Sequence, residues 1–144
     1  MNDNNQQPDL AALRHSTAHL LAAAVLELYP DAQPTIGPST DEGFYYDFDF
    51  GGAAIGEHDL EAIEKQMRSI VKKWKGFVRT EVSGTEALEY FRANPYKTEL
   101  IAQLDQTDES ITFYQSGTFI DLCRGGHVAD PARVIKHFKL LSVA

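Results

Sequence analysis

The stretch that decides the fold is Leu13–Pro30, "LRHSTAHLLAAAVLELYP". Its apolar residues recur at helical spacing, a run of alanines favours helix, and the proline predicts where the helix ends. Apolar residues also surround its two histidines, so we expect a largely buried helix. His15 and His19 are one helical turn apart and therefore share a face. Two titratable side chains in such a helix require polar partners or a cavity.

Length and composition indicate one domain with a substantial core. The chain has 144 residues, of which 43% are hydrophobic. It has no apolar run long enough to span a membrane and no leader pattern. A single cysteine, Cys123, excludes an internal disulfide and favours a reducing compartment. We therefore expect a cytoplasmic protein that has no membrane association.

The charge is distributed unevenly along the chain. The formal net charge is −8, but residues 1–64 carry one basic and twelve acidic side chains, and residues 65–144 carry twelve basic and nine acidic ones. The densest basic cluster is "KKWK" at 72–75. Such a cluster is more often the solvated face of a helix, although this half can also meet phosphate. We expect weak, salt-sensitive RNA binding by the half from Lys65 onward.

The rest of the pattern predicts an α+β fold: an antiparallel sheet packed in two layers with the buried central helix and a second, amphipathic helix, the helices lying on one side of the sheet. Ser83 and Glu86 form a capping box that opens a short helix ending before Pro95. The other predicted elements are a disordered arm at 1–9, a strand around Thr35 and Ile36, strands at 44–50 and 77–82, a helix at 59–75 capped by Gly76, and a hairpin turning at Ser116 and Gly117.

A second group of reactive side chains lies in "TFIDLCRGGHV", residues 118–128. Strand alternation places Asp121 and Cys123 on one face, with Ile120 and Leu122 expected on the core side. The two glycines allow a tight turn that brings His127 back beside them. The patterns H-x-x-x-H and C-x-x-x-H together fit either a zinc tetrahedron or a hydrolytic pocket that needs no metal.

Several segments together resemble the editing domain of bacterial threonyl-tRNA synthetases, which alanyl-tRNA synthetases share in a looser form. They are "HSTAHLLA" (15–22), "TIGPSTDEGFYYDFDF" (35–50), "DLEAIEKQM" (59–67), "PYKTELI" (95–101), "DLCRGGHV" (121–128) and "HFKLLSVA" (137–144). The resemblance covers residues 10–144. It implies an esterase that removes serine wrongly attached to threonine tRNA, and a fragment of a longer chain that continues into an aminoacylation domain.

The resemblance also implies roles for particular side chains. His15 would order the attacking water, while His19 and His127 would fix the site or contact the substrate. Lys97 would hold water or a ribose hydroxyl, and Asp121 would recognise the amino group or hydroxyl of the amino acid.

Two further residues have alternative roles. Cys123 can act as a covalent nucleophile, but the resemblance favours direct attack by water, with the thiol shaping the amino-acid site. Tyr46 packs on the adenosine together with the Gly37 and Pro38 turn, or it is a core tyrosine.

The chain departs from the resembling family, and other functions stay open. Where that family has the sequence CRGPH, this chain has Gly126 in place of the proline, which predicts a more mobile loop before His127. No cofactor is expected, but alanyl-type relatives hold zinc with a set equivalent to His15, His19, Cys123 and His127. A module that docks tRNA without catalysis is the other alternative. The expected partners are the acceptor end of threonine tRNA carrying serine and the rest of a synthetase chain, and the fragment is expected to be a monomer.

Overall fold

The computed structural model describes residues 9–107 and 109–144, so nearly all of the predicted N-terminal arm lies outside the described residues. The described part combines helices with two small antiparallel sheets, which confirms the α+β prediction. The helices are α1 (Leu10–Leu28), α2 (Leu60–Val71), α3 (Gly84–Tyr90), α4 (Pro95–Asp105) and α5 (Pro131–Val134). The strands are β1 (Gln33–Pro34), β2 (Phe48–Asp49), β3 (Val78–Val82), β4 (Ile111–Ser116) and β5 (Phe119–Leu122).

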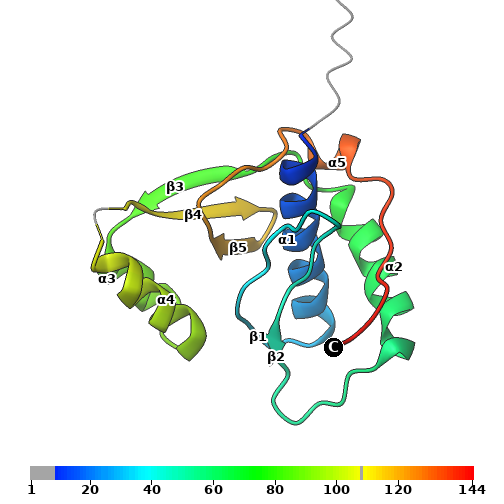
Figure 1. Ribbon diagram of the computed structural model, residues 1–144, viewed down its shortest axis with the longest axis horizontal. Helices are drawn as coiled ribbons and strands as arrows, with labels where there is room; N and C mark the ends of the chain where they lie inside the picture. Colours follow the sequence, from blue (N-terminus) through cyan, green and yellow to red (C-terminus); the bar gives the residue numbers. More distant parts are fainter. Residues whose placement is uncertain (1–8, 108) are drawn as a thin grey trace, which may run out of the picture.

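Helix α1 stands at the centre of the molecule, between the larger sheet and α2 (Figure 1). Its N-cap is Asp9, whose side chain accepts a hydrogen bond from the backbone N–H of Ala11. Its middle turns, from Ser16 to Leu20, are buried, and so is the stretch from Ala22 to Val25. The prediction of a largely buried helix is confirmed, and both faces of α1 contact other elements.

Helix α2 packs along α1 but is shorter than the sequence predicted. It ends at Val71 and its C-cap is Lys72, so the prediction that the helix continues to 75 and is capped by Gly76 is wrong. Trp74 is nevertheless buried, because its ring packs against Phe77 and Phe119. The backbone carbonyl of Trp74 accepts a hydrogen bond from the backbone N–H of Ala132. The apolar pattern in the sequence continues past the end of the helix because Trp74, after the helix, also packs in the core.

The larger sheet has the order β3-β4-β5, and both pairings are antiparallel. The predicted hairpin is confirmed, and Gly117 at its turn has a φ of 59°, which glycine adopts without strain. One face prediction is wrong. Phe119 and Asp121 are buried, whereas Ile120 and Leu122 are only partly buried. The reason is that α1 covers the Asp121 face, so the polar residue lies on the more enclosed side.

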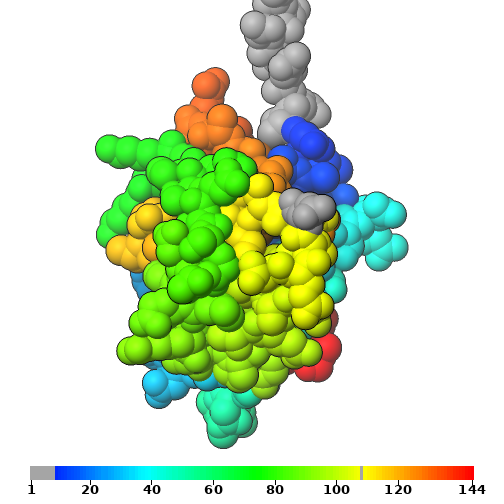
Figure 2. Space-filling model, turned by 90° about the vertical axis from the view of Figure 1, so that its left-hand side faces the viewer, coloured from blue at the N-terminus to red at the C-terminus, as the bar shows by residue number. Residues whose placement is uncertain are grey.

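Helices α3 and α4 pack against the other side of the sheet, so the helices cover both faces rather than one. Their apolar residues form a second core cluster with sheet residues such as Phe113 and Leu122. Figure 2 shows this side of the molecule, where the green and yellow segments that include β3, α3, α4 and β4 form most of the surface. Ser83 caps α3, because its Oγ accepts a hydrogen bond from the backbone N–H of Glu86, which confirms the predicted start of this helix. The reciprocal half of the predicted capping box is replaced by a bond between the two side chains, at 3.1 Å. Helix α4 was not predicted, although Asn94 caps its start.

The segment predicted as a strand at 44–50 pairs with β1 over two residues at β2 and forms one isolated antiparallel bridge, between Phe44 and Ser39. Backbone hydrogen bonds from Thr35 to Asp47 and from Asp47 to Ile36 extend the contact irregularly. The alternation still holds in part, because Tyr46 is buried and Phe48 packs against the core. Residues 36–39, between these two strands, line a cavity beside α1.

The C-terminal segment runs beside α2 (Figure 1). The buried carboxylate of Glu64 accepts a hydrogen bond from the backbone N–H of Leu140 at 2.7 Å. Among the described residues, no helix is both long and apolar enough to cross a membrane.

Candidate functional site

A cavity of about 480 Å³ lies between α1, α4, β5 and the turn at 36–39. Its wall contains five of the predicted site side chains together with Gly37: His15, His19, Lys97, Asp121 and Cys123. The first two come from α1, Lys97 from α4, and the last two from β5 and its end. Segments far apart in the sequence therefore bring one ammonium group, one carboxylate, one thiol and two imidazoles to a single opening.

Lys97 and Asp121 form a buried ion pair at the bottom of this site. Lys97 is 2% exposed and Asp121 is 3% exposed. The Nζ atom of Lys97 donates to Oδ1 of Asp121 at 2.7 Å and to the hydroxyl of Tyr46 at 3.1 Å. The Tyr46 hydroxyl in turn donates to Oδ2 of Asp121 at 2.6 Å. The three side chains therefore hold one another, and the lysine is not an exposed residue of the α4 surface.

Tyr46 is buried at this position and its ring stacks on Phe48 with centroids 4.9 Å apart. It supports Asp121 from the core rather than lining the cavity, whereas Gly37 and Pro38 do line it. The packing of Tyr46 on adenosine stays a prediction. The sequence did contain a signal for the observed role. Phe44, Tyr46 and Phe48 alternate on one face, and a tyrosine on such an apolar face must find a hydrogen-bond partner for its hydroxyl in the core.

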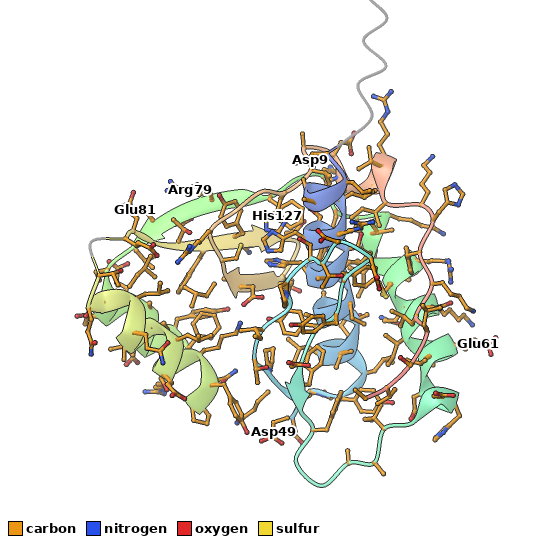
Figure 3. The ribbon with its side chains drawn as sticks, in the orientation of Figure 1. Asp9, Asp49, Glu61, Arg79, Glu81 and His127 are labelled. Atoms are coloured by element: carbon orange, nitrogen blue, oxygen red, sulfur yellow. The ribbon has the colours of Figure 1, made fainter. Side chains whose placement is uncertain are left out.

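The three histidine rings pack against one another beside the ion pair. The His127 ring stacks on His15 with centroids 4.2 Å apart and on Phe77 with centroids 4.0 Å apart. His19 contacts both other histidines edge-on. Its Nε2 atom lies 3.7 Å from Oδ2 of Asp121, which connects the histidine cluster to the ion pair. Figure 3 shows His127 between the sheet and the N-terminal half of α1.

The turn after Cys123 brings His127 back beside Cys123, as predicted, and also into the cluster with His15 and His19. Gly125 and Gly126 have φ values of 102° and 86°, and only glycine adopts such angles without strain. Proline is fixed near −65°, so the backbone conformation at 126 excludes a proline there. The Nε2 atom of His127 lies 3.3 Å from the Cys123 sulfur. The greater mobility expected of this loop stays a prediction.

Gly37 approaches the Tyr46 ring so closely that a Cβ atom at this position would overlap the ring carbons. We expect Gly37→Ala to lower the free energy of unfolding by about 1–3 kcal/mol, because the buried ring must move and it holds Asp121. Gly43→Ala is the matched control, since a Cβ there meets no atom within 4 Å. Urea unfolding of both variants measures the difference, and equal stability would contradict the close approach.

Comparisons with known proteins identify relatives of this chain. It is 52% identical over 135 residues to the threonine–tRNA ligase of Enterococcus faecalis, and the match covers 94% of this chain and 21% of that protein. It is 54% identical over 137 residues to the enzyme of Burkholderia ambifaria, with the same coverage. The chain is related to the threonine–tRNA ligases. It spans about a fifth of the length of these curated relatives. No family model matches it.

The threonine–tRNA ligase relationship agrees with the resemblance found in the sequence, and the cavity lies within the related segment. Sequence reasoning missed three residues that contact His127: Ser16, Phe77 and Tyr114. The place of Ser16 within the H-x-x-x-H motif, directly after His15, was an available signal. For the two aromatic residues there was none, because their contacts depend on how the sheet packs on α1.

The histidine and cysteine side chains fit a zinc ion by their chemistry. Each of His15, His19, Cys123 and His127 offers one ligand atom, and these atoms lie within 4.8 Å of one another. Tetrahedral zinc separates its ligand atoms by about 3.3–3.8 Å, so side-chain shifts of about 1 Å would close the set. The buried Nδ1 atom of His19 has no hydrogen-bond partner among the described residues. The donor set can therefore hold zinc.

Burial keeps the histidines neutral near pH 7. It lowers the pKa of His15, although hydrogen bonds with the backbone of Gly125 and Gly126 oppose this effect. Burial lowers the pKa of His19 well below its ordinary value and that of His127 to about 2, and the neighbouring histidines add to both effects. Burial also raises the pKa of the Cys123 thiol to about 12, which disfavours the thiolate.

These shifts predict a loss of stability in mild acid. An unfolded histidine takes up a proton near pH 6.5, whereas folded His127 does so only near pH 2. The unfolded state therefore binds more protons below pH 6.5, and the free energy of unfolding falls as the pH decreases. We expect His127 alone to contribute a slope of about 1.4 kcal/mol per pH unit.

Urea unfolding between pH 7.5 and 5 measures this slope, and His127→Gln should flatten it. His58→Gln is the control, because the His58 side chain is 81% exposed. Equal slopes for the wild type and His127→Gln would contradict the assignment.

Proposed function

We propose that this chain hydrolyses the ester that joins serine to threonine tRNA, and so removes a wrongly attached amino acid. One observation carries the proposal: in a relative of threonine–tRNA ligases, a single cavity collects neutral imidazoles beside a buried Lys97–Asp121 pair. Its volume of about 480 Å³ lies in the range of ligand pockets and accommodates an aminoacyl group with part of a nucleoside.

The chemistry requires a positioned water, a group that takes its proton, and positive charge near the developing oxyanion. His15 is the group we assign to the water, because it lines the cavity, is only partly buried and is neutral. Lys97 supplies the positive charge, held in place by Asp121 and Tyr46. Asp121 also offers its carboxylate to the amino group or hydroxyl of serine. The raised pKa of Cys123 supports attack by water over attack by sulfur.

Selectivity for serine follows from size exclusion. Serine and threonine differ by one methyl group, whose favourable burial is worth only about 1–3 kcal/mol, so a threonine-binding synthetic site does not reliably reject serine. In this proposal the cavity walls at His19, Asp121 and Cys123, with His127 against Cys123, would enclose the β-hydroxyl. The extra methyl group of threonine would then displace the water or clash. We therefore expect fast loss of the seryl ester and slow loss of the threonyl ester.

The test is to mix the purified chain with tRNA carrying serine, threonine or alanine at neutral pH and to follow ester loss against a sample without protein. Faster loss of serine than of threonine supports the proposal. Equal rates for these two esters would refute the size exclusion, and a preference for alanine would favour the alanyl-type activity. Binding without any turnover would leave a docking module.

A second candidate is a zinc-dependent deacylase, favoured by the four convergent donors and by the unpaired Nδ1 atom of His19. When bound, zinc lowers the pKa of a coordinated water to about 7. Elemental analysis of protein purified without added metal distinguishes the two mechanisms. We expect less than one zinc per chain, whereas one full equivalent that survives mild chelation and is required for hydrolysis would establish the zinc mechanism.

A further inference from the structure

Ser16 is a buried residue of α1 that the proposed reaction does not use directly. It lies between His15 and the Thr17–His19 turn, and its exposed fraction is 0%. Its Oγ atom lies 3.0 Å from Nδ1 of His127, and the same atom accepts a hydrogen bond from the backbone N–H of Val128 at 3.0 Å. One serine oxygen therefore contacts both the His127 ring and the backbone that follows it, more than a hundred residues along the chain.

Stacking restrains the plane of the His127 ring but does not decide which nitrogen faces which neighbour. His15 and Phe77 lie on the two sides of the ring, at interplanar angles of 21° and 13°. Aromatic stacking of this kind is compatible with either orientation and with either position of the proton. The choice depends on hydrogen bonds in the plane of the ring, and these are made by Ser16 and Cys123.

The hydrogen-bond inventory of Ser16 decides the direction of the contact. Its oxygen already accepts from Val128, and its hydroxyl has one proton to donate. Among the described residues, Nδ1 of His127 is the acceptor within reach of that proton. A buried hydroxyl without an acceptor is costly, so the proton points to Nδ1. In the neutral ring Nδ1 is then unprotonated, and the ring proton is on Nε2.

We propose that Ser16 is a positioning residue that holds His127 in the Nε2–H tautomer, with this N–H directed at the Cys123 sulfur. His127 then donates toward the thiol at 3.3 Å and does not act as a base for it. The kinetic consequence of this inference rests on the proposed function. Ser16 and His127 would keep the Cys123 thiol protonated as part of the cavity wall, while His15 takes the proton from the attacking water. Binding of a metal through Nε2 would require the other tautomer and would leave the Ser16 hydroxyl without its acceptor.

The direct test is nitrogen NMR of the chain labelled with ¹⁵N-histidine, with His127 identified by its loss in His127→Gln. The wild type should show a protonated Nε2 and an unprotonated, hydrogen-bonded Nδ1. In Ser16→Ala the ¹⁵N shift of Nδ1 should move to that of an unprotonated nitrogen that accepts no hydrogen bond. Ser16→Thr should restore the wild-type shift, because threonine keeps the hydroxyl. Thr17→Val is the matched control, since it removes a buried hydroxyl of the same turn that bonds to Leu13 instead.

The kinetic arm uses the seryl ester. Ser16→Ala should lower kcat on the order of 10-fold with KM unchanged, the effect typical of losing the partner that orients a functional histidine. A proton on Nδ1 in the wild type, or an unmoved Nδ1 signal in Ser16→Ala, would overturn the inference. The wild-type spectrum decides the point even where Ser16→Ala fails to fold. If neither the wild type nor any variant hydrolyses an ester, the proposed function is wrong. The NMR result still decides whether Ser16 sets the tautomer of His127.

Discussion

Replacing Lys97 by methionine is expected to lower the free energy of unfolding by about 3–5 kcal/mol at neutral pH, because it leaves a buried carboxylate without its counter-charge. Asp121 is 3% exposed and cannot regain that interaction from solvent. Tyr46 and the backbone N–H of Leu122 still donate to it, but neither carries a charge. Methionine keeps the apolar stem of the side chain, so the measured loss reports the ammonium group rather than a cavity.

The control for this prediction is the double variant Lys97→Met with Asp121→Asn, which removes both charges. It should recover part of the lost stability, since a neutral amide is far cheaper to bury than an unpaired carboxylate. Lys75→Met, at an exposed lysine, should change stability by about 0.5 kcal/mol or less. Urea unfolding of the four proteins measures these differences. A loss below about 1 kcal/mol for Lys97→Met would show that the ion pair is not closed in solution.

His15→Ala is expected to slow hydrolysis of the seryl ester by on the order of 10²-fold or more, the scale of a lost general base. His15 lines the cavity and is less buried than His19, so the substitution should remove the group that orders water without unfolding the chain. The decrease should appear in kcat. Because burial lowers the pKa of His15, the neutral imidazole persists below pH 6.5, and the wild-type rate should stay level from pH 7.5 to about that value.

Two comparisons make the His15 experiment specific. Cys123→Ala should cost less activity than His15→Ala if water is the nucleophile, and the reverse order would favour a covalent thioester route. His58→Ala, outside the cavity, should leave the rate unchanged. A rate for His15→Ala within a few fold of the wild type would contradict the role of His15, and the stability of the same variant would show that folding is not the cause.

Several elements could be predicted because their signals are local. The periodicity before Pro30, the capping box at Ser83 and the turn at Gly117 each predicted an element that the structure contains. The two glycines before His127 likewise predicted a tight turn. Signals of this kind depend on residues a few positions apart in the sequence, so the elements they predict form independently of the tertiary packing.

Other features could not be predicted because they depend on what packs against them. Helix α2 ends before Trp74 although the apolar pattern continues, because the tryptophan ring packs against Phe77 and Phe119 beyond the end of the helix. Strand β5 turns Asp121 inward because α1 and α4 supply His19 and Lys97 as partners. Strand alternation alone favours burial of the face with Ile120 and Leu122, because burying an unpaired carboxylate is costly. The charge of Lys97 makes burial of the Asp121 face favourable instead.

The sequence by itself determined that a buried helix carries His15 and His19 and that Cys123 and His127 share a turn, since helical and strand periodicities act within one segment. Only the tertiary structure decided that these segments meet, that Lys97 is buried against Asp121, and that Ser16 contacts His127. Each of those contacts joins residues far apart in the chain. Their energies come from desolvation and pairing at the meeting point, which no local pattern encodes.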